Sequence, residues 1–246
     1  MTVTTAGSGR QSTELRTAAV PALRTLGTVT LIGIACGILV VGVLSRLAMF
    51  VLIELNPTVV GMTSDDGFEM GRFTLSGSLN LALLAGPGFG ILGAGFYLAL
   101  RGLAVGPPWF RMLSLSVGAG VVVGSMIIHA DGVDFTMLDP LWLAVLLFVL
   151  VPTVFVVLLR FLAERALAGA PWPRTLAYLG VVAWLPLLPG FLLLAAGWAA
   201  LNGLRRSESG ARLLSHPLPA WIARGALAAL FVASVLDIVE DVRLIT

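Results

Sequence analysis

The sequence predicts an all-α polytopic transmembrane helix bundle, and its composition and the grouping of its apolar residues indicate this. Of 246 residues, 58% are hydrophobic and 11% are charged, and the mean hydropathy is +1.01. Soluble domains carry about a quarter charged residues, so this chain could not cover a water-facing surface. Its apolar residues also form runs near the roughly 20 residues that cross a bilayer. We therefore expect one membrane-embedded helical domain over residues 26–246.

Six apolar segments predict six membrane spans. They cover residues 26–53, 78–100, 112–128, 141–159, 175–201 and 218–239. The fifth contains Pro186 and Pro189, which remove helix hydrogen bonds and should kink or break the helix. We expect one kinked crossing there, with a re-entrant hairpin as the alternative. The preceding residues 1–25 form a polar tail that we expect to be partly disordered.

The distribution of arginine predicts which side of the membrane each loop faces. The chain has no lysine, a usage typical of a genome rich in G and C. Because cytoplasmic loops are enriched in basic residues, the N-terminus is expected in the cytoplasm and the loops 54–77 and 129–140 outside. Six alternating spans would place both termini in the cytoplasm. The arginines of loop 202–217 would then lie outside, so either packing outweighs charge in the last span or the fifth segment does not fully cross.

The two outer loops form the candidate functional surface, because they are rich in carboxylates and contain a single arginine. Such an acidic extracytoplasmic face could bind a cation, a cationic ligand or a basic partner. The acidic loops also have a non-functional explanation. Acidic residues influence membrane topology little and can therefore accumulate outside without a binding role. The candidate ligand or partner residues are Asp65, Asp66, Glu69, Arg72, His129, Asp131 and Asp134.

Within the stretch 129–140, most polar residues have a local structural explanation. Asp139 before Pro140 predicts a helix N-cap followed by proline at the first helical position. Asp131 before a glycine predicts a turn. His129, Asp131 and Asp134 are metal-ligand types, but their spacing matches no known metal site, so neither a metal nor another cofactor is predicted.

The outer loops share a short sequence that predicts how they meet. Phe-Thr follows Arg72 in the first loop and Asp134 in the second. Both segments are β-prone in composition. We hypothesise that the loops dock in extended form, burying Phe73 and Phe135, with Arg72 facing Asp131 or Asp134.

Pairs of small residues four apart predict close helix packing. These packing residues are Gly33, Gly37, Gly86, Gly90, Gly120 and Gly124. Gly88, Gly90 and Gly93 also match a dinucleotide-binding pattern, but nothing before them reads as a soluble βαβ unit. An alternative function follows from the same glycines: a small transporter or channel-like protein could line a pathway with the glycine-rich second span and the proline-broken fifth span.

The sequence disfavours an enzyme. It contains no serine-hydrolase elbow and no zinc-protease motif, and its two histidines lie in loops, which excludes a haem held between spans. The only cysteine, Cys36, lies in the first span, so no intrachain disulfide is possible. The net charge of +2 does not indicate nucleic-acid binding. We expect a non-enzymatic protein of a bacterial inner (plasma) membrane, surrounded by lipid, with another membrane or extracytoplasmic protein as candidate partner.

Overall fold

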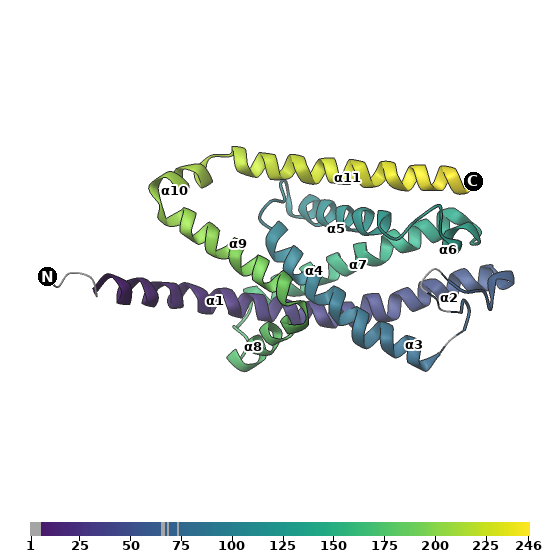
Figure 1. Cartoon of the computed structure of the whole chain (residues 1–246), viewed down its shortest axis with the longest axis horizontal. Coiled ribbons are helices and arrows are strands. Elements are labelled where there is room, and N and C mark those ends of the chain that lie inside the picture. The colour runs from purple at the N-terminus through teal and green to yellow at the C-terminus, as the bar shows by residue number, and fades with distance from the viewer. Residues whose placement is uncertain (1–5, 65–66, 68, 73) are drawn as a thin grey trace.

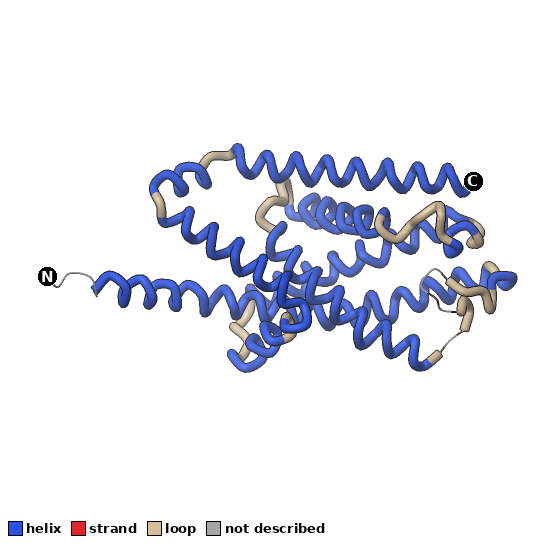
Figure 2. The backbone as a smooth tube through the Cα atoms, viewed as in Figure 1, coloured by secondary structure: helices blue, strands red, loops and turns tan. Residues whose placement is uncertain are grey.

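The computed structural model describes residues 6–246 except 65, 66, 68 and 73, and it confirms an all-α helical bundle (Figures 1 and 2). The described part of the chain contains no β-strand, and one isolated antiparallel β-bridge joins Thr63 and Glu69. The helical elements are α1 (Ala6–Cys36), η1 (Gly37–Leu44), α2 (Ser45–Leu55), η2 (Pro57–Val59), α3 (Leu75–Asn80), η3 (Leu81–Ala85), α4 (Gly86–Leu100), α5 (Pro108–Ser125), α6 (Val133–Thr136), α7 (Leu141–Ala168), α8 (Arg174–Val182), η4 (Leu185–Leu187), α9 (Leu188–Arg206), α10 (Glu208–Ser215) and α11 (Leu218–Ile245).

Within the described residues, five helices are long and apolar enough to cross a membrane, which is compatible with a multi-pass membrane protein. They are Ala19–Leu55, Leu75–Leu100, Leu141–Ala168, Leu185–Arg206 and Leu218–Ile245. The first two are continuous helices with π-helical insertions, η1 and η3. α5, on the predicted third span, has 18 residues and is less apolar than these five. The predicted polar tail is helical from Ala6 onward, as the N-terminal part of α1.

The core forms where α1, α4 and α7 meet. Its buried residues are Val29, Ile32, Cys36 and Val40 from α1 and η1, Ala94 and Tyr97 from α4, and Phe155, Leu159 and Ala163 from α7. A smaller core joins Leu52 of α2 to Ile128, Phe135 and Ala144 at the other end of the bundle. The larger core therefore holds α1, α4 and α7 together, and the smaller core holds α2 and the segment 126–140 against α7.

The predicted packing glycines lie at two helix crossings. A Cβ atom on Gly90 would overlap the carbonyl oxygen of Gly33, and one on Gly86 would lie 2.9 Å from the carbonyl oxygen of Gly37. The absence of side chains therefore lets the backbones of α1 and α4 touch. Gly120 and Gly124 of α5 similarly face α7, where an added Cβ on Gly124 would lie 2.7 Å from Val149 Cγ2.

The first long helix runs between two chemically different ends of the bundle. Near its start, Arg24 Nε donates to the carbonyl oxygen of Trp172, 3.1 Å away in the loop between α7 and α8. Just beyond its end, Asn56 hydrogen bonds to Asp139 in the loop before α7. We call the end with loops 101–107, 169–173 and 207–217 the arginine end. The acidic end carries loops 56–74 and 126–140 (Figure 1).

The last helix runs in the same direction as α5, from the arginine end to the acidic end. Arg224, near its start, donates from Nε to the carbonyl oxygen of Leu103 at 2.9 Å. Asp241, near its finish, accepts a hydrogen bond from the backbone N–H of Ala130 at 3.1 Å. The start of α1 and the end of α11 therefore lie at opposite ends of the bundle, whereas six alternating spans would bring them to the same end.

The last helix runs in this direction because the fifth predicted span is not one kinked helix. It is broken into α8 and α9, a hairpin whose outer ends both lie at the arginine end (Figure 1). The break falls at Trp184–Leu187, where Pro186 has no backbone N–H to donate and interrupts the helical hydrogen bonds. At this turn the buried indole of Trp184 donates from Nε1 to Thr30 Oγ1 at 2.9 Å. The hairpin places residues 207–217 at the same end of the bundle as the other basic loops (Figure 1), so their arginines no longer conflict with the expected enrichment of basic residues on one side.

Candidate functional site

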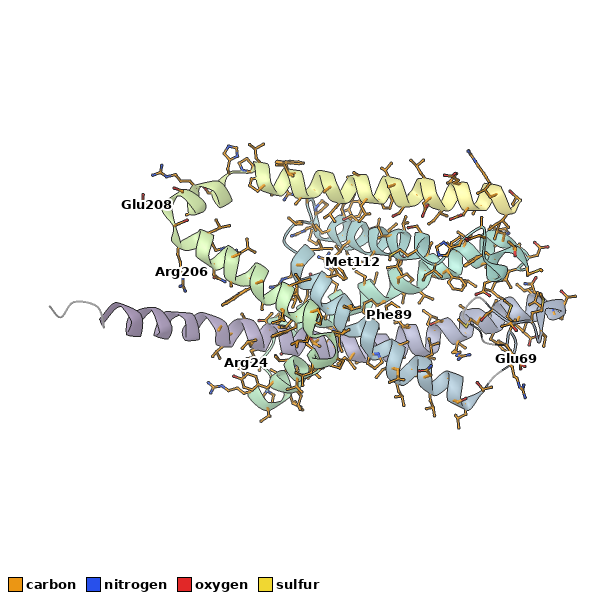
Figure 3. All side chains as sticks on the ribbon, viewed as in Figure 1. Arg24, Glu69, Phe89, Met112, Arg206 and Glu208 are labelled. Carbon is orange, nitrogen blue, oxygen red and sulfur yellow. The ribbon has the colours of Figure 1, made fainter. Side chains whose placement is uncertain are left out.

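The acidic end gathers carboxylates from three segments that are distant in the sequence. The end of α2 and the outer loops contribute Glu54, Glu69, Asp131, Asp134 and Asp139, and α11 adds Asp237, Glu240 and Asp241. The arginines of these segments and of the adjoining helix α2 are Arg46, Arg72 and Arg243. The opposite end carries most of the remaining arginines, and Figure 3 shows Glu69 at one end and Arg206 toward the other. Asp65 and Asp66 fall outside the described residues.

The contribution of α11 was missed by the sequence reasoning. Six alternating spans would place the end of the last span, which carries Asp237, on the cytoplasmic side. The hydrogen bond between Asp241 and the N–H of Ala130 places this helix end against the second outer loop. The anomalous arginines of loop 202–217 were the signal that could have revealed it.

In the first outer loop, Arg72 pairs with its near neighbour Glu69. Nη1 of Arg72 lies 2.7 Å from Oε2 of Glu69, with the two side chains 70% and 49% exposed. The hydrogen bond and the charge of Glu69 raise the pKa of the Arg72 guanidinium above its ordinary value. The N–H of Met70 donates to the carbonyl oxygen of Met62 at 2.7 Å, and the N–H of Gly61 donates to the carbonyl oxygen of Met70 at 2.9 Å. These bonds hold the segment that carries Glu69 and Arg72 against the residues that follow η2.

The second outer loop is not extended, so the predicted pairing of two extended segments is wrong. Val133–Thr136 forms the single-turn helix α6 after Gly132. Its Phe135 is buried and packs edge-on against Phe148, with ring centroids 5.0 Å apart. Burial of the aromatic ring among helices of the smaller core favours one helical turn over β-pairing with the first loop. Phe73, the predicted partner, lies outside the described residues.

The two outer loops nevertheless meet, through a residue that the sequence reasoning did not single out. Asn56, 7% exposed, donates from Nδ2 to the carbonyl oxygen of Asp139 at 2.9 Å and accepts from its N–H at 2.8 Å. The predicted N-cap role of Asp139 is wrong, because α7 begins at Leu141 with Pro140 in the cap position. An asparagine can satisfy a backbone donor and acceptor together, which explains the residue type.

The remaining predicted residues of this stretch face solvent to different degrees. His129 and Asp131 are exposed, with Asp131 in a turn, and Asp134 is half-buried in α6. Among the described residues, no three His, Cys, Asp or Glu side chains come close enough to hold one metal ion. The acidic end is thus a broad surface of separate carboxylates, suited to electrostatic attraction of a cationic molecule.

The interpretation of the acidic end rests on the geometry of this chain alone. No family model, curated protein or solved structure matches the chain.

Proposed function

We propose that this chain is a non-enzymatic membrane protein whose acidic end binds a basic partner or small cationic ligand outside a bacterial inner membrane. The observation that carries the proposal is the placement of the α11 carboxylates beside the outer loops, through the Asp241–Ala130 hydrogen bond. Three independent segments then present carboxylates on one surface, where they outnumber the arginines. A cluster of like charges raises the local concentration and the association rate of oppositely charged molecules.

The distribution of charge along the bundle supports the orientation that this proposal needs. The carboxylates outside the acidic end are Glu14, Glu164 and Glu208. With the hairpin at the arginine end, every loop rich in arginine lies on one side, as expected for a cytoplasmic face. The acidic end is then extracytoplasmic, and the N-terminus is cytoplasmic.

The transporter alternative finds less support in this arrangement. Gly86 and Gly90 face the α1 backbone, so these glycines of α4 are used in helix packing. The proline break between α8 and α9 lies against a small cavity of about 160 Å³ lined by apolar residues such as Trp184, Leu185 and Phe191. We therefore propose binding at a surface rather than passage through the bundle.

The proposal is tested by binding of cationic probes to the purified full-length protein in neutral detergent. Spermidine, calcium and an arginine-rich peptide are titrated while the thermal unfolding midpoint is followed. We expect a rise with at least one probe, reduced in a double variant Asp131→Asn/Glu240→Gln and by added salt. Glu208→Gln, an exposed carboxylate at the opposite end, is the matched control. Equal responses of the wild-type protein and the double variant to every probe would contradict the proposal.

A further inference from the structure

A polar pocket at the arginine end lies between three membrane helices and is separate from the acidic surface. Its cavity of about 310 Å³ is lined by Tyr97 and Arg101 at the end of α4, Arg111 and Leu115 of α5, and Arg160 and Glu164 of α7. This volume is at the lower edge of the roughly 300–1,000 Å³ found for small-molecule sites. Three guanidinium groups thus share one pocket with one carboxylate.

The single carboxylate does not neutralise these cations. Glu164 pairs with Arg160, whose Nε lies 2.8 Å from Glu164 Oε1. The carboxylate side chain is 58% exposed while the Arg160 side chain is 12% exposed, so the cation is the more buried partner. Arg101 and Arg111 therefore add two positive charges beside an ion pair that is already formed. Their mutual repulsion disfavours the pocket unless an anion enters it.

Arg111 provides a second and independent observation. Its Nε–H is buried and finds no hydrogen-bond acceptor among the described residues. A buried donor without a partner costs about 1–3 kcal/mol, and more when the group is charged. Such a group is rare unless a ligand or another acceptor satisfies it. The missing acceptor should be an anion that fits beside three guanidinium groups.

A phosphate group meets these requirements. The planar guanidinium of arginine presents paired N–H donors that match phosphate oxygens in a bidentate arrangement. Basic pockets between transmembrane helices near the cytoplasmic surface are a known setting for the headgroups of anionic lipids. We infer that the pocket formed by Arg101, Arg111 and Arg160 binds a phosphate group, carried either by an anionic lipid headgroup or by a soluble phosphate.

Arg224 stabilises the wall of this pocket from α11. Its Nε donates to the carbonyl oxygen of Leu103, within the loop that joins Arg101 to α5, and its guanidinium lies over the Trp221 ring at 5.1 Å. The loop is thereby tied to the last helix. The same helix ends at the acidic surface, so α11 contacts both the wall of the pocket and that surface.

The test uses the purified full-length protein and two arms that distinguish the two sources of phosphate. In the first arm, inorganic phosphate is titrated in neutral detergent while the thermal unfolding midpoint is measured. In the second arm, the midpoint is compared in phosphatidylcholine nanodiscs and in nanodiscs that also contain phosphatidylglycerol. Each arm is run on Arg111→Gln, Arg160→Gln and the matched control Arg205→Gln, which removes an exposed arginine at the same end outside the pocket. If Arg111→Gln does not fold, Arg101→Gln replaces it.

The result expected is stabilisation that weakens by about tenfold or more in apparent affinity when a pocket arginine is lost and stays unchanged in Arg205→Gln. A response in the first arm identifies a soluble phosphate site, and one confined to the second arm identifies a lipid headgroup site. Without phosphate, Arg111→Gln should be no less stable than the wild-type protein, because it removes an unsatisfied buried donor. No response in either arm, or an equal loss in Arg205→Gln, would overturn the inference.

Discussion

The side-chain amide of Asn56 hydrogen bonds to both backbone groups of Asp139, at 2.9 Å to the carbonyl oxygen and 2.8 Å from the N–H. One buried side chain thus joins the end of the first long helix to the residue before α7. Asn56 also donates to the carbonyl oxygen of Leu52 in its own helix at 2.8 Å. The two outer loops are held at their bases, beneath the exposed carboxylates.

Asn56→Ala is therefore expected to destabilise the protein by about 1–3 kcal/mol, because it leaves backbone groups of Asp139 unpaired at a partly buried site. The free energy of unfolding in mild detergent is the measurement. Asn202→Ala is the control, since the Asn202 amide donates to the carbonyl oxygen of Trp198 within its own helix and its loss should have a small effect. Equal losses in the two variants would show that Asn56 does not join the loops.

Gly90→Ala should destabilise the contact between α1 and α4, because the new methyl group would overlap the Gly33 carbonyl oxygen and force the helices apart. We expect a loss of about 1–3 kcal/mol in the free energy of unfolding. Gly88→Ala in the same helix is the control, because no heavy atom lies within 4 Å of its added Cβ. It should be neutral or slightly stabilising, since alanine favours helix more than glycine does. A comparable loss at both positions would contradict the backbone contact.

The hydrogen bond between Trp184 and Thr30 should be measurable as a coupling energy. Thr30→Val keeps the shape of the side chain but removes the acceptor, leaving the indole N–H unpaired, at a cost of about 1–3 kcal/mol. Thr30→Ser should largely retain stability. In a double-mutant cycle, Thr30→Val should cost less in a Trp184→Phe background, where no N–H remains to be satisfied. An additive cycle would indicate that the hairpin docks by shape alone.

The direction of α11 can be checked by labelling with a membrane-impermeant maleimide in intact cells. In a Cys36→Ala background, Thr246→Cys is expected to react from outside, because the C-terminus lies at the acidic end. Ser209→Cys, in the loop region that carries Arg206 and Arg212, should react only after the cells are opened. Labelling of Ser209→Cys from outside would instead support a sixth alternating span.

The local features of the fold were predictable because they depend on nearby residues. The starts of the second, fourth and sixth predicted spans lie within a few residues of Leu75, Leu141 and Leu218, since hydropathy changes abruptly there. The roles of Asn56 and Asp241 were not predictable in this way. Each acts on a backbone group far away in the chain, and nothing in the neighbouring residues encodes that partner.

The sequence by itself determined that this protein is a helical membrane protein with acidic and arginine-rich loops. The tertiary structure alone decided that α8 and α9 turn back at Trp184, that α11 therefore runs toward the acidic end, and that Arg101, Arg111 and Arg160 share one pocket. The physical reason is that an apolar segment of this length can form its backbone hydrogen bonds equally well as one kinked crossing or as a hairpin. Contacts with α1 and α4, which are distant in sequence, select between the two.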